Sequence, residues 1–212
     1  MAARNFYCFD DRFNGAALGS EWSVADTSAG GTPTKAMHAD GFHLAFSNDN
    51  EVQNLCLYFG DILSFDVTKV REVEFQVKMD AATKDSATTL AVGVGSSRND
   101  TTDSISVNAM FKIVNASTNL ALVAETDDGT TDTDDKATGQ SLSTSVKTLL
   151  ISFAKGLSDV RFFIDNNPVC EDTTFSMAAA TGGVQPFVQI QKTADTNTDG
   201  ILVRRVIVRG VA

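Results

Sequence analysis

Asp159-Val160-Arg161-Phe162-Phe163-Ile164-Asp165-Asn166-Asn167-Pro168-Val169-Cys170 predicts two β-strands joined by a tight turn. Aromatic and β-branched residues, which favour strands, fill positions 160 to 164, and the Asx-rich run before Pro168 supplies the chain reversal. Side chains alternate between the two faces of a strand, so Val160, Phe162 and Ile164 share one face. We expect that face to be buried and the opposite face to be partly covered.

The same alternation recurs along the chain and predicts an all-β protein. It is clearest over residues 70–79, where Val73, Phe75, Val77 and Met79 alternate with polar side chains. Further strand-like segments lie at 41–46, 55–59, 89–95, 105–114, 120–125, 146–153, 187–191 and 201–208, and a short helix is predicted at 175–180. Strands with one apolar and one polar face favour a two-sheet antiparallel β-sandwich, or jelly roll, over a closed barrel.

Length and composition indicate one domain that needs no disulfide or metal to fold. We predict a single β-sandwich over residues 15–212, preceded by residues 1–14 as an N-terminal arm or an edge strand. The cysteines Cys8, Cys56 and Cys170 are odd in number and widely spaced, which favours free thiols. Neither a signal peptide nor a membrane-spanning run is recognisable, which predicts synthesis in a cytoplasm. The net charge of −10 argues against nucleic acid or an anionic membrane as a partner.

Two resemblances extend this interpretation. The opening residues 9–15 with Leu18 and Trp22, together with segments 159–165 and 201–208, resemble the concanavalin A-like (laminin G-like) jelly-roll domain. Segments 58–61, 126–132 and 184–192 resemble uncharacterised virion proteins of tailed phages. The second resemblance implies a capsid decoration or cement protein, which would act as an oligomer on the shell surface.

These resemblances lead to a functional prediction and an alternative. The prediction is a non-enzymatic virion structural protein, made in the host cytoplasm, that binds the major capsid protein or other virion proteins at the capsid surface. It would be a homo-oligomer, with a trimer as the first guess, and residues 1–14 would make the contact. The alternative is a carbohydrate-binding, lectin-like module of a phage or bacterial surface protein, with Trp22 and Tyr58 available to stack on a glycan.

Glu72 and Glu74 are the best candidates for paired catalytic carboxylates. The resemblance implies a comparison with laminarinase-like glycoside hydrolases, which carry E-x-D-x-x-E on one strand. Here both glutamates share a face, but Val77 occupies the third acidic position and the polar row continues through neighbouring residues. A solvated strand face explains them, so the sequence predicts no enzyme and no catalytic residue.

His38 and His43 are the only histidines of the chain. Neither lies in a nucleophile motif, and two histidines five residues apart on one strand would point to opposite faces. The sequence therefore assigns them neither a catalytic role nor a joint metal site, and it predicts no cofactor.

Two acidic segments leave calcium binding open. Asp195, Asn197 and Asp199, followed by Gly200, match the first half of an EF-hand loop, but Val206 stands where the bidentate glutamate would be. A hairpin loop ending in Asp-Gly is the simpler interpretation. The aspartates of residues 127–135 fit no known ligand spacing and predict a solvated loop, with cation binding as the alternative; they are Asp127, Asp128, Asp132, Asp134 and Asp135.

Overall fold

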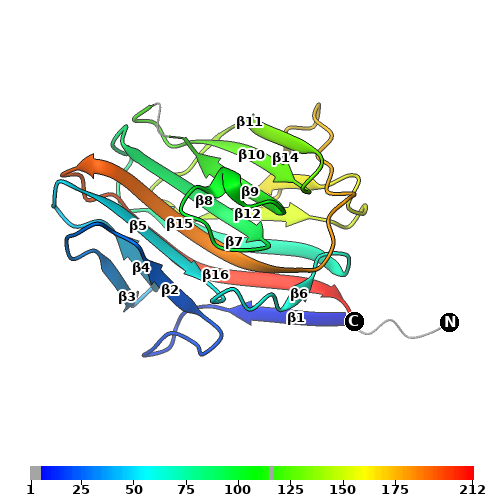
Figure 1. The fold of residues 1–212 in the computed structure, drawn as a ribbon, viewed down its shortest axis with the longest axis horizontal. Helices are drawn as coiled ribbons and strands as arrows, with labels where there is room; N and C mark the ends of the chain where they lie inside the picture. Colours follow the sequence, from blue (N-terminus) through cyan, green and yellow to red (C-terminus); the bar gives the residue numbers. More distant parts are fainter. Residues whose placement is uncertain (1–5, 115–116) are drawn as a thin grey trace.

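Two antiparallel sheets packed face to face form the protein, which confirms the predicted β-sandwich (Figure 1). The computed structural model describes residues 6–114 and 117–212. Sheet A has the order β14-β13-β12-β7-β16-β4-β3, with β1 also pairing with β16. Sheet B has the order β11-β10-β9-β8-β15-β5-β2, with β6 also pairing with β15.

The strand bounds follow from the backbone pairing. Sheet A contains β1 (Phe6–Asp11), β3 (Thr34–His38), β4 (Gly41–Ala45), β7 (Val70–Met79), β12 (Lys147–Ser152), β13 (Arg161–Ile164), β14 (Asn167–Val169) and β16 (Gly200–Val211). Sheet B contains β2 (Ser23–Asp26), β5 (Glu51–Tyr58), β6 (Phe65–Asp66), β8 (Thr88–Gly95), β9 (Asn108–Ile113), β10 (Ala121–Asp127), β11 (Asp132–Ser141) and β15 (Gly183–Asp195).

The hairpin predicted around residue 165 is present as β13 and β14. Asp165 and Asn166 have φ angles of 51° and 65°, the left-handed conformation that a two-residue hairpin turn requires and that Asp and Asn tolerate. Phe162 is buried and packs edge to face against Phe111 of β9, with ring centroids 5.1 Å apart. This strand therefore joins the two sheets through the core.

Alternation along β7 also matches the prediction. Val73, Phe75, Val77 and Met79 are all buried between the sheets, whereas the intervening side chains are half-buried on the outer face of sheet A. Burial of such apolar area is the main favourable term in folding.

Two local predictions are wrong. Residues 175–180 do not form a helix, and the only helix in the described parts of the chain is a 3₁₀ turn, Thr102–Ser104. The acidic segment 127–135 is not simply a solvated loop, because β10 extends to Asp127 and β11 begins at Asp132. β11 is an edge strand held by backbone pairing with β10, so its exposed polar side chains carry little hydrophobic signal.

Residues 6–11 form an edge strand that pairs with residues 206–211 of β16 (Figure 1). The ring of Tyr7 stacks on Phe65 at 5.8 Å, and Phe9 packs edge to face on Phe59 at 5.2 Å. The rest of the expected arm, residues 1–5, lies outside the described residues.

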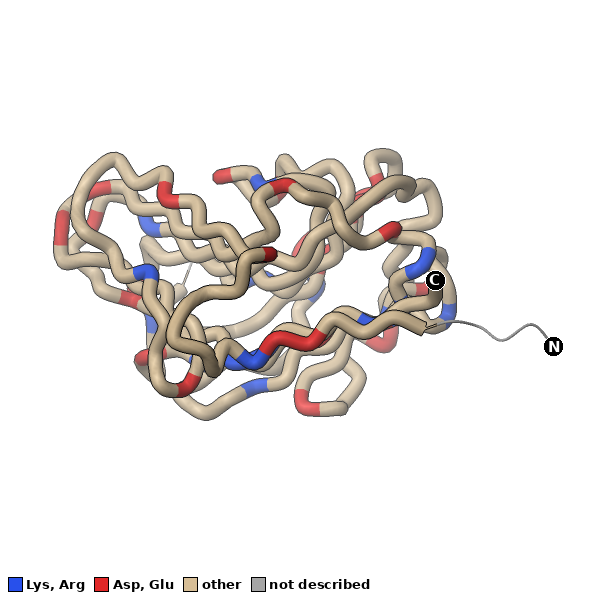
Figure 2. Tube along the Cα trace, turned by 90° about the horizontal axis from the view of Figure 1, so that it is seen from below, with Lys and Arg blue, Asp and Glu red and all other residues tan. Residues whose placement is uncertain are grey.

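Charged residues are dispersed over the molecule, and Figure 2 shows basic positions interspersed with acidic ones along the trace. All three cysteines are free thiols, with Cys56 buried and Cys8 exposed. Among the described residues, no helix has the length and apolar character to cross a membrane.

Candidate functional site

The outer face of sheet B is divided into an apolar half and a polar half. On β15, Val188 and Ile190 point into the core, so Phe187, Gln189 and Gln191 point outward. The apolar half consists of Cys56, Ala91, Met110 and Phe187, all buried. The polar half includes Gln189 and Gln191. In the sheet register, Gln189 pairs with Ala91 of β8, and Ala91 pairs in turn with Lys112 of β9.

The connection between β8 and β9, residues 96–107, folds over the apolar half, and we call it the covering loop. Ile105 is fully buried against this half, and its Cγ2 lies only 2.9 Å from the point where a side chain at Gly95 would begin. The loop is fixed to the sandwich at both ends: the Arg98 backbone N–H donates to Asp61 Oδ1 at 2.8 Å, and Asn108 Nδ2 donates to Ile105 O at 2.8 Å. An apolar surface that would otherwise be solvated is thereby buried.

A cavity of about 240 Å³ remains open over the polar half. The covering loop contributes Thr101, Thr102 and Asp103 to its lining, and the strands and their ends contribute Thr89, Leu90, Ala91, Lys112, Ile113, Val114, Asp135, Gln189 and Gln191. A cavity of this size is slightly smaller than most ligand sites, and about half of its lining is polar. It suits a small group that is rich in hydrogen-bond donors and acceptors.

Lys112 holds three carboxylates together at this cavity. Its ammonium donates to Asp103 Oδ1 at 2.6 Å and to Glu125 Oε2, and it lies 2.9 Å from Asp135 Oδ1. Burial alone lowers the pKa of Lys112, but the hydrogen bonds to the three carboxylates outweigh it and raise that pKa. Burial raises the pKa of Glu125 to about 7, against the opposing effect of Lys112.

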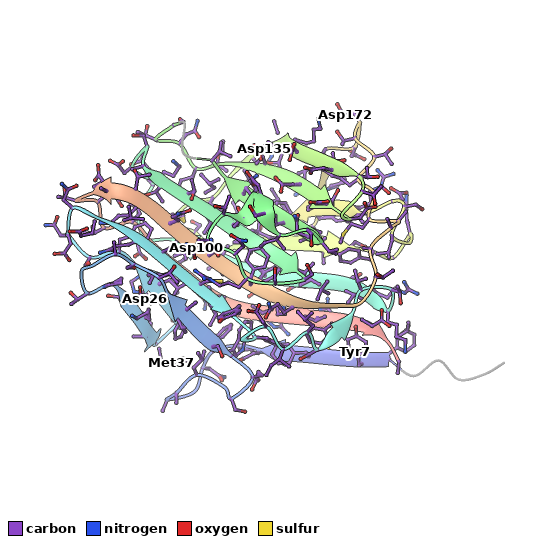
Figure 3. The ribbon with its side chains drawn as sticks, in the orientation of Figure 1. Tyr7, Asp26, Met37, Asp100, Asp135 and Asp172 are labelled. Atoms are coloured by element: carbon purple, nitrogen blue, oxygen red, sulfur yellow. The ribbon has the colours of Figure 1, made fainter. Side chains whose placement is uncertain are left out.

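Gln189, which lines the cavity, has an unused hydrogen-bond acceptor. The residue is 2% exposed, and its Nε2 donates to Asp100 O of the covering loop at 3.0 Å. Its Oε1 is buried and has no hydrogen-bond partner among the described residues. Figure 3 shows Asp100 and Asp135, which lie on the loop and on β11 at this face of the molecule. A buried acceptor without a donor costs about 1–3 kcal/mol, so Gln189 favours any ligand that donates to it.

Glu72 and Glu74 lie on the other sheet, away from this cavity. Both project from the outer face of β7 toward Arg209, whose Nη1 is 3.1 Å from Glu72 Oε2 and 3.5 Å from Glu74 Oε2. Their positions match a charged strand face.

The histidines are closer together than expected. His38 ends β3 and His43 lies in β4, so the two occupy neighbouring strands of a hairpin and their ring centroids are 6.3 Å apart. The expectation of opposite faces on one strand is wrong for that reason. His43 Nε2 contacts Asp80 Oδ2 at 2.7 Å. In the described ranges, no group of three or more His, Cys, Asp or Glu side chains is arranged to hold a metal ion.

The Asp195 to Gly200 segment is not a hairpin, because β15 and β16 belong to different sheets. Asp199 Oδ2 accepts hydrogen bonds from the Asp85 backbone N–H at 2.8 Å and from Thr88 Oγ1 at 2.5 Å. Asp195 Oδ1 accepts from the backbone N–H of Asn197 at 2.7 Å. These side chains therefore hold the crossover between the sheets.

Beside this crossover, the buried ammonium of Lys192 occupies a cage of backbone carbonyls. It donates to the carbonyl oxygens of Ser47, Asp49, Asp195 and Asn197 at 2.7–3.0 Å. The Lys192 ammonium thus provides a positive charge beside the loop where the EF-hand-like pattern suggested calcium.

The acidic segment 127–135 divides between two roles. Asp128 Oδ1 accepts from the backbone N–H groups of Thr130 and Thr131 at 3.0 and 2.6 Å, and its Oδ2 accepts from that of Ala179 at 3.0 Å. Asp135 instead faces Lys112 at the cavity.

The aromatic residues proposed for glycan stacking are not free surfaces. Trp22 is buried, its Nε1 donates to Asp11 Oδ2 at 2.8 Å, and its ring packs edge to face on Phe59. Tyr58 is half-buried against the apolar half of sheet B. The residues that do form the cavity were missed, although Lys112 and Glu125, as charges inside otherwise apolar strand segments, were the available signal.

Comparisons with solved structures show the concanavalin A-like jelly-roll fold. The carbohydrate recognition domain of Emp47p is 11% identical with a TM-score of 0.65, over 97% of this chain and 95% of that one. The laminarinase from Flavobacterium sp. UMI-01 is 10% identical with a TM-score of 0.65, over 94% and 98% of the two chains. The β-glucanase of Bacillus licheniformis is 10% identical with a TM-score of 0.65, over 95% and 97%.

No family model matches the sequence, and no curated protein matches it. The prediction that the chain is not an enzyme is contradicted by the structural comparisons, because two of the neighbours just described are polysaccharide-cleaving enzymes with this fold. The sequence argument excluded catalysis because no third carboxylate accompanies Glu72 and Glu74. That reason was too narrow, because it considered one strand only.

Proposed function

We propose that the protein binds a glycan in the cavity on the outer face of sheet B. The observation that carries this proposal is the open polar half beside a covered apolar half, with Lys112, Asp135, Gln189 and Gln191 converging on one cavity. Hydroxyl groups donate and accept hydrogen bonds, so a saccharide matches such a lining. The likeness to the carbohydrate recognition domain of Emp47p supports the proposal at the level of fold.

Binding would rest on hydrogen bonds more than on aromatic stacking. Trp22 and Tyr58 pack against other residues, and the polar part of the cavity lining consists of amide, hydroxyl, ammonium and carboxylate groups, with no aromatic ring among its described residues. Affinity for a single sugar should therefore be modest, and specificity should come from the positions of the polar groups.

A glycan array followed by calorimetry tests the proposal. We expect the wild type to bind at least one class of oligosaccharide, and Gln191→Ala to weaken binding about fivefold, as the loss of a hydrogen bond of about 1 kcal/mol predicts. Gln140→Ala is the matched control, because Gln140 is an exposed residue of β11 outside the cavity lining.

The array should be read for released reducing ends as well as for binding, because proteins of this fold include polysaccharide-cleaving enzymes. Product formation would add an activity to the site. A wild type that binds no saccharide, or equal weakening in Gln191→Ala and Gln140→Ala, would refute the assignment.

A second candidate is the virion role, with the protein on a capsid surface bound to shell proteins. One observation favours it: the side chains of Phe6 (75%), Ile62 (66%) and Leu63 (40%) are exposed, and residues of β1 and β6 line a separate, largely apolar cavity of about 510 Å³. Exposed apolar groups of this kind often mark protein contacts. None of the neighbours described above is named as a virion protein.

Light scattering during size-exclusion chromatography tests this second candidate. It predicts a trimer of 22.6 kDa chains, which Phe6→Ser should dissociate, and co-purification with phage particles. A monomer at micromolar concentration that is absent from particles would eliminate it.

A further inference from the structure

We infer that the cavity on sheet B prefers glycans that carry a free amino group, the 2-amino-2-deoxy sugars in their ammonium form. This inference rests on the proposed glycan-binding function and names the ligand class of the same site. It follows from the charge at the cavity and from the unused acceptor of Gln189.

The charge at the cavity is unbalanced toward negative. Asp103, Glu125 and Asp135 all face Lys112, which is the only basic residue among the described residues that line the cavity. Even when Glu125 is protonated, the carboxylates of Asp103 and Asp135 exceed the single ammonium of Lys112 by one charge. Asp103 and Asp135, with side chains 64% and 45% exposed, remain accessible from the cavity while Glu125 is buried behind them.

This arrangement discriminates between classes of sugar. A uronic acid, a sialic acid or a sulfated sugar would bring a negative charge to carboxylates that are already in excess, which is unfavourable. A neutral sugar would gain only neutral hydrogen bonds. An ammonium group would gain charge-assisted hydrogen bonds to Asp103 or Asp135, which are stronger than neutral ones.

Gln189 provides an independent reason for a donor-rich ligand. Its Nε2 is committed to Asp100 O, so the orientation of the amide is set, and Oε1 is the atom left without a partner among the described residues. That acceptor is neutral and therefore pairs with an N–H or O–H of the ligand. Lys112 cannot provide the missing donor without leaving a carboxylate, since it already contacts three of them.

Calorimetry with four matched tetrasaccharides tests the inference. The glucosamine tetramer is cationic, the N-acetylglucosamine and glucose tetramers are neutral, and a tetrameric glucuronate is anionic, whereas all four are built on the same pyranose ring. We expect the glucosamine tetramer to bind about tenfold more tightly than its N-acetylated form, a difference of about 1.4 kcal/mol. The glucuronate should bind most weakly, and the preference should shrink as salt is raised.

Asp135→Asn locates the preference within the cavity. Asn tolerates the positive φ of 42° at this position, so the backbone of β11 should be retained. We expect the preference for the amine to fall from about tenfold to about threefold or less. Asp134→Asn removes the same charge from the neighbouring exposed residue and should leave the preference intact, which separates the cavity from the general attraction of a protein with net charge −10.

The possible outcomes distinguish this inference from the function on which it rests. Equal binding of the amino and N-acetylated tetramers would overturn the amine preference and leave glycan binding in place. A preference that persists equally in Asp135→Asn and Asp134→Asn would also overturn it, because the amine would then be held elsewhere. Binding of none of the four tetramers would overturn the amine preference, and it would overturn glycan binding as well only if the wild type also bound no saccharide on the array.

Discussion

Replacing Lys192 by Met should destabilise the protein by about 3 kcal/mol. The change keeps an unbranched side chain that is one heavy atom shorter, and it removes an ammonium that donates to four backbone carbonyls at 2.7–3.0 Å in the interior. An ammonium has three protons, so about three bonds are lost, each of roughly 1.5–3 kcal/mol for a charged donor. The desolvation that the buried charge no longer suffers returns part of that sum, which leaves the net loss near 3 kcal/mol.

For a chain of this length, that loss corresponds to a decrease in Tm of roughly 6–12 °C. Thermal unfolding followed by circular dichroism, together with urea denaturation, measures it. Lys155→Met is the matched control, because the side chain of Lys155 is 66% exposed and its distance to Asp159 is 3.9 Å. The control should change stability by less than about 0.5 kcal/mol.

The result that would refute this reasoning is a Lys192→Met variant that unfolds within about 1 °C of the control. The carbonyls would then be satisfied without the ammonium, and the cage would not hold the crossover between β15 and β16. Because the ammonium already fills the cage, we also expect EDTA to leave the Tm of the wild type unchanged. A decrease on chelation would restore calcium binding at this loop as an explanation.

Three further predictions concern the core, the covering loop and the buried acid. Phe162→Ala should cost about 3–5 kcal/mol in urea denaturation, because Phe162 is buried between Phe111 and Phe175, whereas half-buried Phe163→Ala should cost less than half as much. Gly95→Ala should lower the free energy of unfolding by about 1–3 kcal/mol, because its new methyl group would meet Ile105 Cγ2 at 2.9 Å. Ile105→Ala in the same chain should relieve part of that loss. Strictly additive effects in the double-mutant cycle would contradict this contact. The pKa of Glu125 is raised to about 7, so the folded state binds its proton more tightly than the unfolded state does, and the free energy of unfolding should fall as the pH rises from about 4.5 to about 7. Glu125→Gln should lack that part of the pH dependence, and a carboxyl titration near pH 4.5 by ¹³C NMR in the wild type would show that burial is not the dominant influence.

Local sequence patterns were sufficient for the architecture. The alternation over residues 70–79 and the Asp165-Asn166 turn each depend on neighbours within a few positions, and β7 and the β13–β14 hairpin have the predicted form. Polar edge strands were the exception. β11 carries mostly exposed side chains, so it shows no apolar alternation, and only its pairing with β10 makes it a strand.

The candidate site depended on sheet register and on one long connection, which no local pattern specifies. Lys112 and Glu125 meet because β9 and β10 pair, Asp103 joins them because the covering loop folds back over sheet B, and Gln189 faces them from β15, far along the chain. A strand alternates with a period of two whatever its partners are, so the sequence by itself determined which side chains share a face of an amphipathic strand such as β7. Which outward residues meet at one cavity was decided only in the tertiary structure, because that depends on pairings between segments tens of residues apart.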